Sequence, residues 1–292
     1  MTNLATLRAG LAALLLLLCL PLAALAQDAL DDDEVIPPEP TEQPEWLEGR
    51  GENELVLIHG LGASNEIWDR IKGYLGGTFQ LHLYELHGHG TKPPLDNPTI
   101  SSETAALRAW IQDQGLIYPT IAGHGLGGMI AMQYAADYPA EIQRVVVMDA
   151  APRQLASQEE KDQVTKSLVE DYDRFVASRY LMMSNDDSIN EKAIDWALRT
   201  DSASFTSLLL SSFTWDLTAE LPNQSVPMLV IGSLAFFPES GYERHYLEEY
   251  GFGTARILNY KRMENAGHYM MLENPSYLAS VFIVWIRGEE LR

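Results

Sequence analysis

The sequence is organised around a stretch from Tyr118 to Asp149, in which an apolar strand, a glycine turn, a helix and a second apolar strand follow one another. The turn reads Gly-His-Gly-Leu-Gly-Gly over residues 123–128. Further strand and helix patterns alternate before and after this stretch, which predicts an α/β fold. The turn itself is the first candidate for a functional site.

Two mechanisms would use such a turn. In the nucleophile elbow G-x-S-x-G, a strand turns sharply into a helix and holds a serine in strained backbone geometry above the sheet. Gly123 and Gly127 flank the tip as this pattern requires, but the tip is Gly125. The turn also fits the dinucleotide pattern G-x-G-x-x-G through Gly123, Gly125 and Gly128, with Asp149 placed like the acid that binds a ribose. The turn alone leaves both mechanisms open.

The first 26 residues are typical of a cleaved secretory signal. They contain one arginine, Arg8, then the apolar run Leu11 to Leu25, and they end in Ala-Leu-Ala before Gln27. Cys19, the only cysteine, lies inside this segment. We therefore expect an exported protein, periplasmic or secreted, whose mature form has no thiol, disulfide or thiolate metal site.

Charge and composition narrow the class of partner. Removing Arg8 with the signal takes the formal net charge from −21 to −22. A surface this acidic repels nucleic acid and anionic lipid headgroups. We therefore expect neither nucleic acid nor, after signal cleavage, a membrane as a partner. Residues 27–44 combine an acidic run with four prolines and are expected to form a disordered leader. Residues 45–292 then have enough apolar material for one domain.

Alternating patterns give the expected elements of this domain. Apolar strands are expected at residues 54–58, 79–84, 120–122, 145–148, 228–231 and 255–260. Helices are expected at residues 66–75, 104–114, 127–138 and 242–250, and from Asn274-Pro275 through Trp285.

The alternation is interrupted by a purely helical stretch, from Arg153 to about Leu221. Ser157 with Glu160 forms a capping box before the first helix, with apolar positions continuing to Val176. A Ser188 cap with Glu191, and then apolar positions from Phe205 to Phe213, mark two more helices. We expect this insert to cap the carboxyl edge of the sheet. Within it, Met182 and Met183 are expected in the core rather than lining a flexible pocket.

With these elements placed, the chain resembles the α/β-hydrolase superfamily of esterase and lipase type, from about Glu54 to Arg287. Four motifs carry the resemblance: His-Gly-Leu-Gly at 59–62, Gly-His-Gly at 88–90, the glycine-framed elbow, and Ala-Gly-His at 266–268 followed by Glu-Asn-Pro at 273–275. Each motif alone is a weak pattern, but their order and spacing together are specific. The resemblance implies a mostly parallel sheet with helices on both faces.

The resemblance also implies roles for individual residues. The backbone N–H groups of Leu61 and Leu126 would form an oxyanion hole, which needs no particular side chain. His268 would be the general base. His59 would support the oxyanion loop, and His124 would be a packing residue.

Two positions depart from the family. Gly125 offers no oxygen at the elbow tip, so covalent acyl-enzyme chemistry there is excluded. The segment after the strand at 228–231 is apolar where the triad acid would be expected, and Glu239 comes late. Asp149 is the substitute that its position favours, although it could equally serve to cap the turn at residues 150–152.

Three functions follow. The first is an ester or acyl hydrolase that retains at most weak hydrolysis through His268; the second is a non-catalytic binding protein, a pseudoenzyme, for a small hydrophobic or carbonyl ligand. The third, a nicotinamide-dependent oxidoreductase built on the glycines and Asp149, leaves the His-Gly-Leu-Gly and Ala-Gly-His loops unexplained. No cofactor is expected. No metal is expected either, because only His87 and His89 lie close together in sequence.

Overall fold

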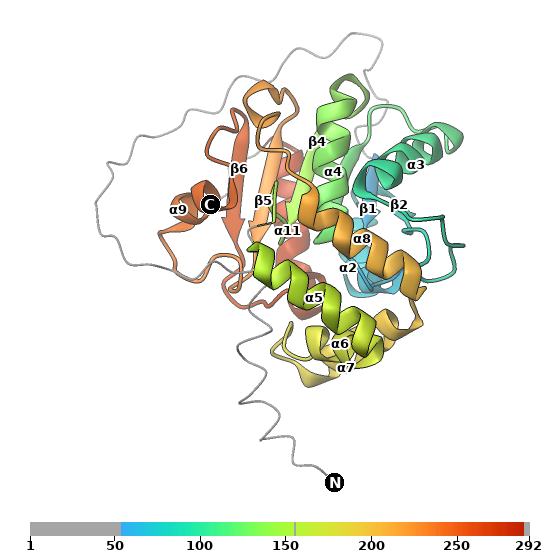
Figure 1. Ribbon diagram of the computed structural model, residues 1–292. Coiled ribbons are helices and arrows are strands. Elements are labelled where there is room, and N and C mark those ends of the chain that lie inside the picture. The colour runs from blue at the N-terminus through green and yellow to red at the C-terminus, as the bar shows by residue number, and fades with distance from the viewer. Residues whose placement is uncertain (1–53, 155, 289–292) are drawn as a thin grey trace.

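A computed structural model describes residues 54–154 and 156–288. The expected signal peptide at 1–26 and leader at 27–44 lie outside these residues. Within them, none of the helices has both the length and the apolar composition needed to cross a bilayer. The described residues form a three-layer arrangement of one sheet between helices, with further helices at one end (Figure 1).

The sheet has six strands in the order β2-β1-β3-β4-β5-β6, and every neighbouring pair is parallel. The strands are β1 (Glu54–Ile58), β2 (Gln80–Tyr84), β3 (Thr120–His124), β4 (Arg144–Met148), β5 (Met228–Gly232) and β6 (Leu258–Arg262). Parallel strands need long connections, and helices supply most of them here. The mostly parallel α/β sheet expected from the sequence is confirmed.

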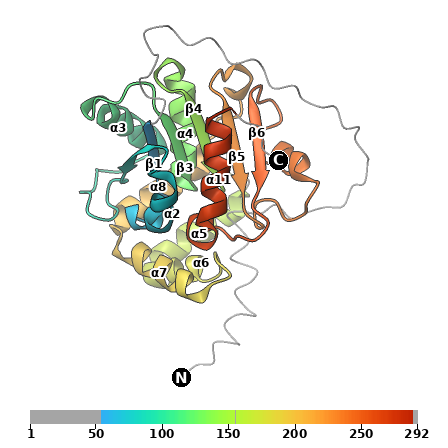
Figure 2. The same cartoon turned by 180° about the vertical axis from the view of Figure 1, so that it is seen from behind.

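Both faces of the sheet are buried. In β1, Leu55 and Leu57 contribute to one apolar cluster and Val56 and Ile58 to the other, because successive side chains of a strand point to opposite faces. Helices α2 (Asp69–Leu75) and α11 (Pro275–Ile286) cover the first face, and Figure 2 shows them in front of the strands. The second face is covered by α3 (Ile100–Asp113), α4 (Leu126–Asp137) and α9 (Glu243–Tyr250).

Several element boundaries differ from those expected. Helix α3 begins at Ile100 rather than Thr104, because Thr99 and Ser102 form a reciprocal capping box. Strand β6 begins at Leu258, three residues later than expected. The helix expected at residues 66–75 is present as a short helix, η3 (Asn65–Trp68), that runs directly into α2. Three further short helices carry too little periodicity to be read from the sequence: η4 (Pro139–Glu141), η5 (Leu221–Asn223) and α10 (Met270–Glu273).

The helical stretch between β4 and β5 contains four helices instead of three. They are α5 (Gln158–Glu170), α6 (Tyr172–Tyr180), α7 (Asp187–Arg199) and α8 (Ser202–Thr214). The expected capping box of Ser157 and Glu160 is present in α5. The long first helix was expected to continue to Val176 but breaks at Asp171, whose side chain caps α6. The expected Ser188 cap is wrong: Asp186 caps α7 and accepts from Ser188 N–H.

These four helices lie together at the end of the sheet toward which the strands point, as both ribbon views show. Their chain leaves and rejoins the sheet at one place. Arg153 and Asp216 form an antiparallel bridge, and Leu217 N–H donates to the carbonyl of Pro152 at 2.8 Å. These two points form the neck of the insert. At its α6–α7 turn, Met182 is 57% exposed, so the expectation that it packs in the core is wrong for this residue.

Candidate active site

The glycine turn forms a sharp connection between β3 and α4. Gly125, at its tip, has φ 53° and ψ −119°, a conformation that L-residues with side chains rarely adopt. Gly123 and Gly127 are required by close packing, because a Cβ on either would collide with backbone: with the Gly127 carbonyl group in one case and with the carbonyls of Ile58 and His59 in the other. The turn therefore has the shape of a nucleophile elbow.

The expected base and acid meet beside this turn. His268 Nδ1 lies 3.0 Å from Asp149 Oδ2, and the two side chains are only 16% and 3% exposed. The other carboxylate oxygen of Asp149 accepts from Ser233 N–H at 2.7 Å. Because a carboxylate only accepts, Nδ1 carries the proton and the lone pair of a neutral ring lies on Nε2.

His268 faces the tip of the turn. A Cβ placed on Gly125 would lie 3.7 Å from His268 Nε2 and 3.8 Å from Gly60 Cα. A serine hydroxyl at this position would therefore fall within reach of Nε2, and its backbone would have to adopt the same positive φ. Gly60 belongs to the loop after β1, so three separate loops converge on Gly125.

The expected oxyanion groups lie on two of these loops. Leu126 is the first residue of α4, where a helix has no internal acceptor for its N–H. Leu61 follows Gly60. Within the described residues neither N–H donates a hydrogen bond, so both remain available to an oxygen. The carbonyl of Leu61 accepts from the hydroxyl of Tyr180, at the end of α6, at 2.6 Å.

Two buried histidines join the loop after β1 to the loop after β2. His59 Nδ1–H donates to the Gly60 carbonyl at 2.8 Å, and its Nε2 accepts from Leu86 N–H at 3.1 Å. Reciprocally, His89 Nε2 accepts from Gly62 N–H at 3.1 Å. Burial lowers the pKa of His59 to about 4 and that of His89 to about 3, which keeps both rings neutral at pH 7. The expected supporting role of His59 thus has a geometric basis.

The loop that carries His268 is fixed from three sides. Gly267 N–H donates to Glu273 Oε2 at 2.8 Å, and His268 N–H donates to the carbonyl of Met183 in the insert at 2.8 Å. His124 Nε2–H donates to the His268 carbonyl at 2.9 Å. Burial first, and then the neighbouring His268, hold the pKa of His124 well below its usual range, so His124 acts as a neutral donor.

Comparison with known proteins identifies the family. A family model described as "Alpha/beta hydrolase family" matches residues 55–281. The chain belongs to the alpha/beta hydrolase family. The matched range covers the sheet from Leu55 in β1 to the end of β6, the helical insert and the three loops that meet at Gly125.

Several known proteins are similar to this alpha/beta hydrolase. A pimeloyl-[acyl-carrier protein] methyl ester esterase from Salmonella heidelberg is 35% identical over 104 residues, which span 36% of this chain and 39% of that protein. An enol-lactonase from Burkholderia xenovorans LB400 is 21% identical with a TM-score of 0.68, over 80% of this chain and 91% of the other. An esterase from Exiguobacterium antarcticum is 15% identical with a TM-score of 0.70, over 80% and 92% of the two chains. Both solved structures share the fold.

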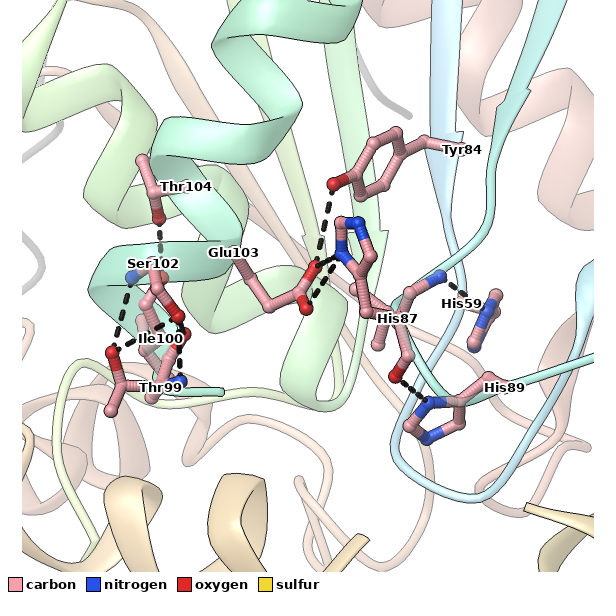
Figure 3. A network of polar contacts seen from close by, with 10 residues as sticks. His59, Tyr84, His87, His89, Thr99, Ile100, Ser102, Glu103 and Thr104 are labelled. Atoms are coloured by element: carbon pink, nitrogen blue, oxygen red, sulfur yellow. Dashed lines mark hydrogen bonds and ion pairs between the residues drawn. The ribbon is translucent and has the colours of Figure 1, made fainter. Parts of the chain in front are cut away.

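Sequence patterns did not reveal several residues that contribute to this arrangement in the hydrolase domain. Tyr180 and the backbone carbonyl of Met183 reach the site from the insert. The sequence singled out Met183 only for its side chain, and no local motif marks Tyr180. The sequence also gave no sign of a histidine–carboxylate pair away from Gly125. His87 Nδ1 lies 3.0 Å from Oε1 of the fully buried Glu103 (Figure 3). The other carboxylate oxygen of Glu103, Oε2, accepts from the Tyr84 hydroxyl at 3.3 Å. In the described residues no three His, Cys, Asp or Glu side chains come together as metal ligands would.

Proposed function

We propose that this protein is of the ester or acyl hydrolase type but lacks the nucleophile of its elbow, where Gly125 stands. We propose that it retains at most weak hydrolytic activity, which depends on His268. The observation that carries the proposal is the 3.7 Å separation between His268 Nε2 and the Cβ position of Gly125. The imidazole of His268, held by Asp149, thus faces the position of a serine side chain at the elbow tip. Gly125 places no side chain at that position.

In the proposed reaction a water molecule stands beside Gly125, close to the position that a serine hydroxyl would take. His268 Nε2 takes its proton while the oxygen attacks the substrate carbonyl, and the N–H groups of Leu61 and Leu126 stabilise the developing oxyanion. Asp149 keeps the ring oriented and stabilises the imidazolium that forms. Enzymes of this mechanism that lose triad members retain on the order of 10³-fold rate enhancement from the oxyanion hole and binding. Hydrolysis is therefore expected to be slow but above background.

The substrate class is a small carboxylic ester or a related carbonyl compound. The similarity to a methyl ester esterase supports this choice, as does the acidic net charge of −21, which disfavours polyanionic substrates. We further propose that the protein is exported and that the segment 1–26 is removed. N-terminal sequencing of the protein from its native compartment tests this, with Gln27 expected as the first residue.

The alternative function is a binding protein for a small hydrophobic or carbonyl ligand, and the absence of a side chain at Gly125 favours it. A dinucleotide site has less support, because both carboxylate oxygens of Asp149 are engaged, one by His268 and one by Ser233 N–H. The Asp149 side chain is also only 3% exposed, whereas an acid that binds a ribose must be reached by the hydroxyl group.

A comparison of the wild type from Gln27 with Gly125→Ser tests the proposal. Both are incubated with a fluorophosphonate probe and with p-nitrophenyl esters of increasing acyl length. We expect no covalent label on the wild type, and both labelling and faster ester turnover for Gly125→Ser. The double variant Gly125→Ser/His268→Gln is the matched control, since it restores the hydroxyl without its base. If folded Gly125→Ser takes no label and cleaves none of the esters, the hydrolase proposal is wrong and the binding function is favoured.

A further inference from the structure

We propose that the same site removes a proton from the carbon atom next to a bound carbonyl group, forming an enolate that it then reprotonates. The inference uses the base and the N–H groups of the proposed function, but it needs neither a nucleophile nor an attacking water. It concerns a carbon acid such as a thioester, an ester or a ketone with an α-hydrogen.

The first support is the state of the base. His268 Nδ1 is held by Asp149, so the lone pair lies on Nε2; the hydrogen bonds of His268 within the described residues use its backbone N–H, its carbonyl and Nδ1, and none uses Nε2. In a serine hydrolase a hydroxyl stands between this nitrogen and the substrate. Here Gly125 contributes no atom there, so the substrate itself can approach Nε2.

The second support is the chemical character of the atoms near the Cβ position of Gly125. The three atoms closest to the Cβ position of Gly125 are His268 Nε2 at 3.7 Å, Gly60 Cα at 3.8 Å and His268 Cε1 at 3.8 Å. Of these three atoms, which belong to neither Gly125 nor its chain neighbours, only Nε2 is polar, whereas an ordered water usually has two to four polar partners. A C–H group satisfies these neighbours at least as well as a water molecule does.

The third support is direction. A nucleophile at the elbow tip attacks a carbonyl from above its plane, with the oxygen held by the N–H groups of Leu61 and Leu126. Because His268 Nε2 lies 3.7 Å from the Cβ position of Gly125, we expect it on that same side of a bound carbonyl group, facing its π system. An α C–H bond must be aligned with this π system for its electron pair to delocalise onto oxygen. A base on that side is therefore placed for proton removal.

The step balances without any other reagent. The α C–H bond breaks and its proton moves to Nε2, which forms an imidazolium stabilised by Asp149. The electron pair moves into the new C=C bond, and the carbonyl π electrons move onto oxygen, where the two N–H groups stabilise the charge. Reprotonation by the imidazolium returns the starting compound. If that proton has exchanged with D₂O, the α-carbon acquires deuterium.

The test follows deuterium and thiol together. Acetyl, butyryl and phenylacetyl thioesters of N-acetylcysteamine are incubated in D₂O with the wild-type chain that begins at Gln27. NMR measures the loss of the α-hydrogen, and a thiol reagent measures the thiol released by hydrolysis. We expect α-exchange at least about 10²-fold faster than with His268→Gln, the contribution typical of a positioned general base. Asp149→Asn, which should leave the ring in the wrong tautomer, serves as a second variant. Circular dichroism confirms that each variant is folded.

Exchange that depends on His268 supports the inference whether or not thiol is released. Thiol release that depends on His268, without exchange for any of the three thioesters, supports the hydrolase function and overturns the inference. Exchange at equal rates in wild type and both variants also overturns it, because the base would then lie elsewhere. Gly125→Ala, which fills the Cβ position without adding a hydroxyl, should slow exchange and leave the protein unlabelled by fluorophosphonate.

Discussion

The hydroxyl group of Tyr180 donates a 2.6 Å hydrogen bond to the carbonyl of Leu61, across 119 positions of sequence. Three residues later, the carbonyl of Met183 accepts from His268 N–H at 2.8 Å. One short segment of the insert therefore contacts both the loop with the expected oxyanion N–H and the loop with the expected base. The spacing between these two loops depends on where the insert sits.

Tyr180→Phe should reduce the reactivity of the Gly125→Ser protein. A hydrogen bond of this kind contributes about 1 kcal/mol, so the rate constant for fluorophosphonate labelling is expected to fall about fivefold. Tyr172→Phe is the matched control, because Tyr172 also packs against Phe205 but its hydroxyl has no partner in the described residues. Equal labelling rates for the two variants would show that the Tyr180 hydrogen bond does not position the site.

Gly125→Ala should destabilise the fold through its backbone alone. The nearest atoms to the new Cβ lie 3.7 Å away or more, so there is no clash, but φ at this residue is 53°. We expect a loss of about 1 kcal/mol in the free energy of unfolding, measured with urea. Gly73→Ala in α2 is the opposite control: its Cβ has open space and helical geometry, so a gain of up to about 1 kcal/mol is expected. An unchanged midpoint for Gly125→Ala would contradict the strained turn.

Stability should fall as the pH is lowered from about 6.5 toward 4. In that window the unfolded chain protonates His59 and His89, whereas burial keeps the pKa of each folded ring lower, at about 4 and about 3. The unfolded state then binds more protons, so the free energy of unfolding rises with pH across the window. His59→Asn keeps the donor to Gly60 and removes the titration, so it should flatten the dependence. His245→Asn, at a side chain that is 57% exposed, should leave it unchanged.

Glu103→Ala should be among the most destabilising single substitutions outside the proposed site. The carboxylate is fully buried, and its loss leaves His87 and the Tyr84 hydroxyl without this partner (Figure 3). The expected cost is about 3 kcal/mol in urea unfolding. Glu103→Gln retains an acceptor and should cost less. Glu170→Ala, at a largely exposed side chain of α5, should change the stability by less than about 0.5 kcal/mol. A cost for Glu103→Ala no larger than that for Glu170→Ala would show that the buried pair does not contribute.

Much of the architecture could be predicted because its signals are local. The strand at 54–58, the glycine turn and the helix after it each follow from apolar periodicity and from glycine at positions that exclude a Cβ. The meeting of Asp149 with His268 was one of two alternatives for that aspartate. Position in the chain could not decide between them, because the deciding distance joins residues 119 positions apart.

Other features depend on contacts that no local pattern contains. The apolar positions of α5 and α6 suggested one helix, but the Asp171 side chain accepts from Arg174 N–H and starts a new one. Ser188 satisfied a capping pattern, yet Asp186, two residues earlier, is the residue that caps the helix. Tyr180 and Glu103 belong to ordinary amphipathic helices, and only the fold reveals what their polar atoms contact.

The neck of the insert, where Arg153 pairs with Asp216 and Leu217 N–H donates to the Pro152 carbonyl, gives the molecule a modular character. Chain added or removed between these two points leaves the β4–β5 pairing untouched, because the points already lie side by side and the entropy of closing a loop changes slowly with its length. Between these points, however, the Tyr180 hydroxyl and the Met183 carbonyl hold the Leu61 and His268 loops, so a different insert would keep the sheet but would have to supply these two contacts again.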